Sequence, residues 1–286
     1  MIDNYKTRQI DKFKIVKRKE KTVYKNPSEL TLDQINNYNN NGFIVIKDFF
    51  NRSQIANAKS RSEEIFNNSI GYIINKEPES NIVRSALQVH LLNEFRELID
   101  KRLINISRSI LGGKTYLHQS RINYKHGKSA NGWNWHSDFE TWHAKDGMPN
   151  MNCFTAMAVI DDNTIENGCI NFIPKSHNSF ISCPKIGDVN PDSEFSEQTE
   201  GVPSDLMIDK IKSKYNTDIF NAVCNSGDLV LFDCNTLHYS GSNTTDDKRT
   251  NVYFVFNNIE NRLTNPFNGG DHRPEEMGCT NPVILK

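Results

Sequence analysis

The sequence predicts an α+β fold with a double-stranded β-helix, or jelly roll, as its core and helices that support it. Helical patterns predominate among the predicted elements of the first 111 residues, and from residue 115 onward short apolar runs of strand type follow one another. Two of these runs flank the Asn167-Gly168 pair, which is typical of a tight turn. Helices followed by many short strands favour a double-sheet jelly roll.

The N-terminal part of the chain begins with a polar segment, residues 1–28, which we expect to form an extended arm. Residues 29–286 are expected to form one domain, because the motifs described below run from the first third of the chain to the last. Thr31 can cap a short helix that Gly42 ends. The apolar run at residues 43–46 predicts a strand.

Two helical stretches precede the β-rich part. Ser53 is expected to cap a helix that reaches about Phe66, with apolar residues spaced along one face. Residues 91–111 are predicted to be helical, and Gly112 and Gly113 to close that stretch.

The β-rich part is predicted from apolar runs that are bounded by turn residues. The predicted strands span residues 115–125, 152–160, 169–173, 228–232 and 251–257. The long polar segment at residues 184–222 contains one predicted helix, residues 204–215. Its length is compatible with a lid over a site and equally with a surface excursion.

A metal site is predicted from two histidines and one aspartate. His136 and Asp138 form a His-x-Asp pair, and on a strand such a pair would direct both side chains to the same face. His238 lies one hundred positions after Asp138 and would complete the set from a distant strand. Two imidazoles and one carboxylate hold one face of a non-haem Fe(II) ion and leave its other positions open.

Arg249 extends this prediction to a second ligand. It follows His238 by eleven residues and precedes the apolar run at residues 251–256. A guanidinium at the back of a pocket binds a carboxylate through two hydrogen bonds. An Fe(II) centre that also binds a dicarboxylate is the arrangement of 2-oxoglutarate-dependent oxygenases, in which O2 takes the remaining position.

Several longer stretches resemble the phytanoyl-CoA dioxygenase superfamily and, within it, the ectoine hydroxylases. The most specific stretch is HSDFETWHAKDGMP, residues 136–149. The similarity runs from about Phe43 to Pro274, and it implies the jelly-roll fold together with Fe(II) and 2-oxoglutarate as cofactors. The other matching stretches are residues 83–85, 118–125, 167–168, 173–177, 232–238, 261–263 and 266–267.

The resemblance also implies roles for individual side chains. It places at 2-oxoglutarate Arg249, Gln119, Asn123, Thr155, Ser240 and Trp133. It places at the substrate Arg121, for a carboxylate, and the aromatic walls Trp142, Phe232 and Tyr253, whose ring faces attract cations. Taken without the resemblance, the polar residues on the strand at 115–125 would fit a solvent-exposed face, and the aromatic residues an ordinary core.

The function that the resemblance implies is hydroxylation of a small zwitterion, ectoine, to 5-hydroxyectoine, with ascorbate as reductant in assays. One departure from the ectoine hydroxylases is Lys145, which stands where they usually carry an acid. The alternative is hydroxylation of a free amino acid such as proline, for osmolyte or natural-product metabolism. A third hypothesis, a zinc hydrolase or a non-catalytic metal-binding protein, is disfavoured by Arg249.

Composition narrows the range of partners. The net charge is -1 and Lys and Arg are spread along the chain, so we expect no nucleic-acid partner. No apolar run approaches the roughly 18 residues of a membrane span. The six cysteines lack the paired spacing of metal or disulfide motifs, so we expect reduced thiols and a cytoplasmic protein. A homodimer is compatible with the sequence.

Overall fold

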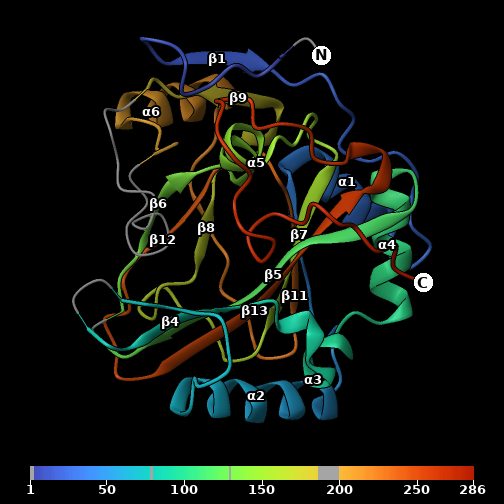
Figure 1. The fold of residues 1–286 in the computed structure, drawn as a ribbon, viewed down its shortest axis with the longest axis vertical. Coiled ribbons are helices and arrows are strands. Elements are labelled where there is room, and N and C mark those ends of the chain that lie inside the picture. Colours follow the sequence, from blue (N-terminus) through green and yellow to red (C-terminus); the bar gives the residue numbers. More distant parts are fainter. Residues whose placement is uncertain (1–2, 78–79, 129, 186–199) are drawn as a thin grey trace.

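The computed structural model describes residues 3–77, 80–128, 130–185 and 200–286, and it shows two antiparallel sheets that face each other (Figure 1). The predicted α+β class and jelly-roll core are thereby confirmed. The strands of one sheet pair far across the sequence, so that β2 lies beside β11 and β7 lies beside β13.

The large sheet has the strand order β2-β11-β7-β13-β5-β4-β3. At its centre β13 pairs with β5 over eleven residue pairs, from Lys248 opposite His126 to Asn258 opposite Thr115. The strands of this sheet are β2 (Phe43–Ile46), β3 (Ile74–Lys76), β4 (Val83–Leu87), β5 (Thr115–His126), β7 (Cys153–Val159), β11 (Leu229–Asp233) and β13 (Lys248–Asn258).

The small sheet has the order β10-β8-β12-β6, and a further two-stranded sheet joins β1 to β9. In the small sheet β12 contacts β6 on one side and β8 on the other, so the segment after residue 236 lies at its centre. The strands of these two sheets are β1 (Lys14–Lys17), β6 (Trp133–His136), β8 (Ile170–Phe172), β9 (Ser179–Ser182), β10 (Phe220–Asn221) and β12 (His238–Ser240).

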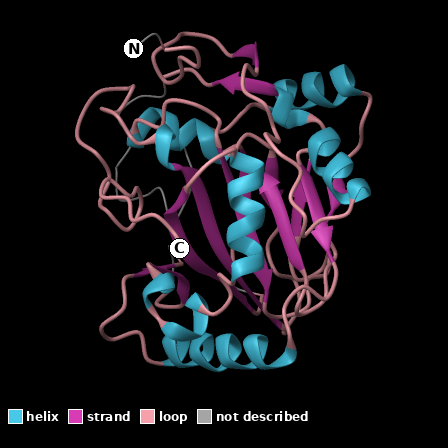
Figure 2. Cartoon of the chain, turned by 90° about the vertical axis from the view of Figure 1, so that its right-hand side faces the viewer, coloured by secondary structure: helices cyan, strands magenta, loops and turns pink. Residues whose placement is uncertain are grey.

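Helices cover the face of the large sheet that points away from the small sheet (Figure 2). Successive side chains of a strand point to opposite faces of the sheet. Ile122 and Phe254 therefore pack against the helices, whereas Tyr253 packs against residues of the small sheet. The helices on this face are α1 (Leu32–Asn41), α2 (Arg52–Asn67), α3 (Asn93–Arg96) and α4 (Lys101–Leu111), whereas α5 (Asp138–Asp146) and α6 (Asp205–Tyr215) pack in other clusters.

The predicted start and end of α1 are confirmed. The Thr31 hydroxyl accepts a hydrogen bond from Gln34 N, and the Gln34 side chain accepts one from Thr31 N. Gly42 ends the helix with a φ of 83°, a left-handed conformation that glycine adopts without strain. The predicted strand at residues 43–46 is confirmed as β2.

Two helix predictions were wrong in detail. Asn51, and not Ser53, caps α2, because the reciprocal hydrogen bonds form between Asn51 and Gln54. The stretch predicted as one helix at residues 91–111 is divided into α3 and α4. Asp100 makes the break: its carboxylate accepts a hydrogen bond from Leu103 N and starts a new helix.

The segment at residues 184–222 lies partly outside the described residues, since the description resumes at residue 200. The helix expected at residues 204–215 is confirmed as α6, which Ser204 precedes in an extended conformation. Ile208 and Ile211 of this helix are buried against β9, next to the small sheet.

The N-terminal arm packs against the rest of the chain. Its strand β1 pairs with β9 from Lys14 opposite Ser182 to Lys17 opposite Ser179. Arg18 is buried, and its Nη1 lies 2.6 Å from a carboxylate oxygen of Asp233, which ends β11. The arm is therefore joined by a buried ion pair to the large sheet.

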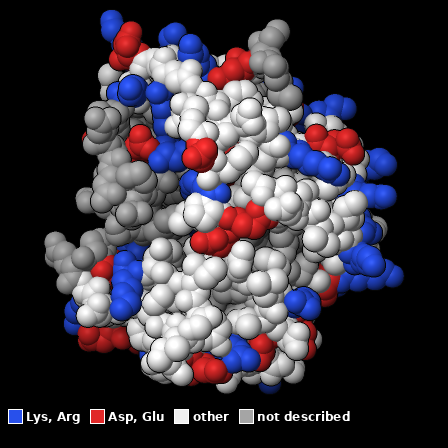
Figure 3. All heavy atoms as spheres, viewed as in Figure 1, with Lys and Arg blue, Asp and Glu red and all other residues white. Residues whose placement is uncertain are grey.

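The surface carries charges of both signs. On the face drawn in Figure 3, Lys and Arg side chains are interspersed with Asp and Glu side chains. Among the described residues, none of the helices is long and apolar enough to span a membrane.

Candidate metal centre and active-site pocket

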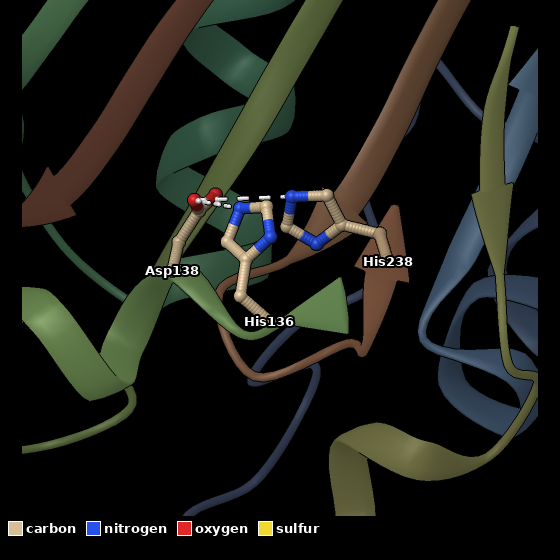
Figure 4. Close-up of side chains that lie close together, drawn as sticks. All are labelled: His136, Asp138 and His238. Carbon is tan, nitrogen blue, oxygen red and sulfur yellow. Dashed lines mark ion pairs between the residues drawn. The ribbon is translucent and has the colours of Figure 1, made fainter. Parts of the chain in front are cut away.

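His136, Asp138 and His238 meet at one end of the small sheet. His136 is the last residue of β6 and stands opposite His238, the first residue of β12. His136 Nε2 lies 3.6 Å from Asp138 Oδ1, and His238 Nε2 lies 3.9 Å from the same oxygen. Figure 4 shows the three side chains pointing toward one another, and their ligand atoms all lie within 4.8 Å of each other.

The prediction that His136 and Asp138 share a strand was wrong. The strand ends at His136, Ser137 remains extended, and Asp138 is the first residue of α5. Asp138 and Glu140 place negative charge in the first turn of the helix, where the helix dipole stabilises it. The carboxylate therefore reaches the histidines from a helix N-terminus.

The protonation of both imidazoles is fixed by backbone carbonyl groups. His136 Nδ1 lies 2.7 Å from the carbonyl oxygen of Asn134, and His238 Nδ1 lies 2.9 Å from that of Thr236. A carbonyl oxygen only accepts, so each Nδ1–H donates. Each Nε2 atom is therefore the ring nitrogen left to face Asp138, and its lone pair is what a metal ion would bind in the neutral ring.

The electrostatics of the three groups also suit a divalent cation. Burial and the neighbouring His136 lower the pKa of His238 to about 4, so its ring is neutral at pH 7. Burial raises the pKa of Asp138, but the two histidines and Arg121 outweigh it, and the pKa lies well below its usual range. Two imidazoles and one carboxylate fit a non-haem Fe(II) ion.

A pocket opens from this centre between the two sheets. It brings together seven of the further residues that the sequence assigned to a site: Gln119, Arg121, Asn123, Trp133, Trp142, Ser240 and Tyr253. The sequence reasoning missed five others that also line it: Thr141, Ile170, Glu200, Tyr239 and Arg273. Thr141 and Tyr239 adjoin recognised motifs, whereas Glu200 and Arg273 come from loops that carried no periodic signal.

Three assigned residues lie behind the pocket lining. The Thr155 hydroxyl is 3.5 Å from Asp138 Oδ2, so it contacts the candidate ligand from the buried side. The ring of Phe232 lies 5.1 Å from that of His238 and packs in the core between the sheets. Arg249 is buried on β13.

Arg249 and Lys125 form a buried group of two basic side chains. Arg249 Nη2 donates to Gly168 O at 3.1 Å, while its Nε is buried with no hydrogen-bond partner. Lys125 Nζ donates to Ser240 Oγ at 2.9 Å and also to the carbonyl oxygen of Gly241. A buried guanidinium with an N–H that has no partner among the described residues, next to a buried amine, fits the far carboxylate of a dicarboxylic acid, whose charge would favour the protonated form of Lys125.

Lys125 was missed, although a signal for it was present in the sequence. It follows Gln119, Arg121 and Asn123 at the same spacing of two, on the same face of β5. Burial and the charges of Arg249 and Arg84 lower its pKa to about 6. Gly168 is needed beside it, since its φ is +78° and a Cβ there would collide with Gly241 O.

Arg121 and Arg273 are the two arginines of the pocket lining, and their surroundings differ. Arg121 lies over the ring of Tyr253, 5.4 Å from its centroid, and its Nε is buried without a hydrogen bond. Arg273 forms two hydrogen bonds of 2.7 Å with Asp146, at the end of α5. The charge of Arg121 is therefore available to a ligand, whereas that of Arg273 is paired.

His143, which lies close to the metal motif in sequence, has a structural role. Its Nδ1 donates to Met148 O at 2.7 Å, and its Nε2 lies 2.9 Å from Asp3 Oδ1 in the N-terminal arm. His118 similarly contacts Asp146 at 3.2 Å. Among the described residues, the one group of three metal-ligating side chains is His136, Asp138 and His238.

A jelly roll that carries two histidines and one carboxylate beside an open pocket has the fold and site of a mononuclear non-haem iron enzyme. The family model for phytanoyl-CoA dioxygenase (PhyH) matches residues 38–251. The chain belongs to this phytanoyl-CoA dioxygenase family.

Curated relatives match over most of the chain. An ectoine dioxygenase from Streptomyces avermitilis is 35% identical over 262 residues, which cover 88% of this chain and 87% of the relative. An ectoine dioxygenase from Halomonas elongata is 37% identical over 256 residues, which cover 86% of this chain and 75% of the relative.

Solved structures agree with these matches. EctD from S. alaskensis with 2-oxoglutarate and 5-hydroxyectoine superimposes with a TM-score of 0.87 at 30% identity, covering 97% of this chain and 95% of that one. The same protein with bound Fe gives a TM-score of 0.87 and covers 100% and 98% of the two chains. The carbocyclase SnoK, at 19% identity and a TM-score of 0.61, covers 82% and 87% and shares the fold.

We expect His136→Ala, Asp138→Ala and His238→Ala each to abolish tight Fe(II) binding and turnover while the protein remains folded. Each change removes one of three ligands, and the ligand side chains are not part of the apolar core. Metal content after purification, circular dichroism and oxygen uptake measure the outcome. His272→Ala, at an exposed histidine, is the control that should retain iron. Near wild-type activity in any of the three variants would refute the assignment.

We expect Lys125→Met to flatten the dependence of stability on pH in the protein without ligands. The folded pKa of Lys125 is about 6 and the unfolded value is the ordinary 10.5, so between these values the unfolded state binds the extra proton. The free energy of unfolding should therefore rise with pH in this window, by up to about 1.4 kcal/mol per pH unit.

Urea unfolding of wild type and Lys125→Met between pH 6.5 and 8.5 measures this contribution as the difference in slope. Lys128→Met, at an exposed lysine nearby, should follow the wild-type slope. Parallel profiles for wild type and Lys125→Met would show that Lys125 titrates normally in the folded protein.

Proposed function

We propose that this protein hydroxylates ectoine to 5-hydroxyectoine, with Fe(II), 2-oxoglutarate and O2. The observation that carries the proposal is the combination, in one pocket, of the candidate metal triad with the guanidinium of Arg121, which has no ion-pair partner among the described residues, beside an aromatic wall. Relatives at 35–37% identity are ectoine dioxygenases, and EctD of S. alaskensis binds Fe, 2-oxoglutarate and 5-hydroxyectoine within the same fold.

His136, Asp138 and His238 would hold the iron through the two Nε2 atoms and the carboxylate. When bound, iron and 2-oxoglutarate together supply the oxidising chemistry that inserts one oxygen atom of O2 into a C–H bond, and 2-oxoglutarate leaves as succinate and CO2. Thr155 keeps the carboxylate of Asp138 in place by donating to Oδ2. The protein decides which C–H bond is positioned for reaction.

Arg249, Lys125 and Ser240 would bind the far carboxylate of 2-oxoglutarate. The contacts of Lys125 with Ser240 and of Arg249 with Gly168 bring both basic side chains to the turn beside β12. Gln119 and Asn123 present amide groups from the adjacent face of β5, and each has a buried oxygen without a partner. Trp133, over which Arg84 lies at 4.1 Å, would form a wall of the same region.

Arg121 would bind the carboxylate of the substrate, with Trp142 and Tyr253 as walls. The ring of Trp142 is held edge-on by His118, at 5.2 Å between centroids. Phe232 would act indirectly, by packing against the ring of His238.

We expect Arg249→Ala to raise the KM for 2-oxoglutarate strongly. Truncating one partner of a buried charge-assisted pair costs about 2–5 kcal/mol. Initial rates of succinate formation at varied 2-oxoglutarate measure the effect, and Arg262→Ala, outside the pocket, serves as the control. An unchanged KM would mean that Arg249 does not bind 2-oxoglutarate.

We expect purified wild-type protein with Fe(II), 2-oxoglutarate and ascorbate to convert ectoine to a product heavier by one oxygen atom, faster than it converts L-proline. Arg121→Ala should lose this turnover, because the carboxylate of ectoine would have no cation to bind. Mass spectrometry and succinate release measure both results.

The second candidate function, hydroxylation of a free amino acid such as proline, would be supported by succinate release that depends on L-proline and not on ectoine. The metal and 2-oxoglutarate assignments would survive that outcome. A zinc hydrolase would show neither dependence and would retain zinc in place of iron.

Cellular location, domain extent and oligomeric state stay predictions. Five of the six cysteines are buried and all six are free, which supports a reducing, cytoplasmic environment. We propose residues 29–286 as the catalytic domain, and size-exclusion chromatography with light scattering tests the homodimer.

A further inference from the structure

The pocket contains one carboxylate that the metal centre does not use. Among the described lining residues the carboxylates are Asp138 and Glu200, and Asp138 belongs to the metal triad. Glu200 lies in the loop that leads into α6, and its side chain is about one-fifth exposed, at 19%. It is therefore a wall of the pocket that a bound substrate can reach.

Two cations hold Glu200 by one oxygen. Arg8 Nη1 of the N-terminal arm donates to Glu200 Oε2 at 2.7 Å, and Lys145 Nζ of α5 lies 2.9 Å from the same oxygen. Glu200 Oε1 accepts no hydrogen bond from the described part of the chain. Neither Arg8 nor Lys145 lines the pocket, so the charge nearest to a ligand here is negative.

The charge of Arg8 is already balanced by a second carboxylate. Arg8 Nη2 lies 2.6 Å from Glu140 Oε2, and the Arg8 and Glu140 side chains are only 4% and 1% exposed. The backbone beside Glu200 is shaped to approach this ion pair. Gly201 has a φ of +69°, and a Cβ there would collide with the carboxylate of Glu140.

Glu200 is ionised at neutral pH. Burial raises the pKa of its carboxyl, but the hydrogen bond from Lys145 and the charge of Arg8 outweigh burial and leave the pKa below its ordinary value. Lys145, which reverses the charge usual in the ectoine hydroxylases, thus stabilises a carboxylate next to the pocket.

Two of the aromatic rings that line the pocket already have an arginine of the protein over them, which limits the cation–π attraction that they can offer to a substrate. The guanidinium of Arg121 already lies over Tyr253, and that of Arg84 over Trp133. Cation–π attraction requires the substrate cation to lie over a ring face. Among the lining aromatic residues, two rings therefore already carry a cation of the protein itself.

We propose that Glu200 binds the cationic part of the substrate while Arg121 binds its carboxylate, which makes Glu200 a specificity-determining residue. The inference rests on the proposed function, because it requires a zwitterionic substrate. The two groups come from β5 and from the loop before α6, so they present opposite charges from different elements of one pocket. A molecule with a carboxylate alone places no cation beside the open oxygen Oε1 of Glu200, whereas a zwitterion can contact both Arg121 and Glu200.

The test is isothermal calorimetry of ligand binding to the protein with Fe(II) and 2-oxoglutarate under anaerobic conditions. The ligands are ectoine, L-proline and cyclohexanecarboxylate, which has the ring and the carboxylate but no cation. In Glu200→Gln the Kd of ectoine should rise about tenfold, as expected for losing one charge-assisted contact. The Kd of cyclohexanecarboxylate should stay the same or fall.

Two further variants separate recognition from folding. Lys145→Met retains the carboxylate and removes one of its cations, so it should bind ectoine at least as tightly as the wild type. Glu166→Gln, at an exposed acid in the turn before β8, should leave all three Kd values unchanged. Unfolding temperatures of the variants report any general damage.

Parallel changes for ectoine and cyclohexanecarboxylate in Glu200→Gln, or no change in the ectoine Kd, would overturn the inference. A wild type that binds cyclohexanecarboxylate more tightly than both zwitterions would also overturn it. Failure of the proposed function looks different. In that case the wild type binds a zwitterion, Glu200→Gln weakens that binding, and aerobic incubation with ectoine forms no hydroxylated product.

Discussion

The structure depends on compensating the charge that is buried between the two facing sheets. Over most of their contact the sheets are joined by apolar side chains, such as Phe43 stacked on Phe172 at 4.5 Å. Around the pocket and the metal triad the facing side chains are ionisable instead. Each isolated ion buried in a protein costs several kcal/mol. Each charge there needs a partner from the protein or from a ligand.

Some of the buried basic side chains around the pocket have carboxylate partners within the protein, and others do not. Arg273 is neutralised by Asp146, and Arg84 by Glu77 at 2.7 Å. Arg249 and Lys125 lack such a carboxylate partner among the described contacts, and a bound dicarboxylate would supply it. A divalent cation would meet the same requirement at His136, Asp138 and His238.

The elements outside the jelly roll, α5 and the N-terminal arm, pack around the pocket. α5 begins with a metal ligand and ends at Asp146, so one helix connects the metal centre to the C-terminal loop that carries Arg273. The N-terminal arm reaches α5 through Arg8 and Glu140 and reaches β11 through Arg18 and Asp233. The outer wall of the pocket is thus assembled from segments far apart in the sequence.

The sequence by itself determined the features that depend on local chemistry. Capping residues located α1, the apolar runs located the strands of the core, and the identities of His136, Asp138 and His238 predicted the candidate metal site. Residue spacing also predicted that Gln119, Arg121 and Asn123 share one face of β5, because strand side chains alternate.

Only the tertiary structure decided which side chains converge from unrelated loops. Glu200 and Arg273 have no periodic neighbours, and they line the pocket because the chain folds back over α5. The tertiary structure also places Thr155 and Phe232 behind the candidate metal ligands. Asp138, which was predicted on a strand, is the first residue of helix α5. Local sequence patterns encode backbone conformation and burial, whereas contacts between distant segments depend on how the sheets and loops pack together.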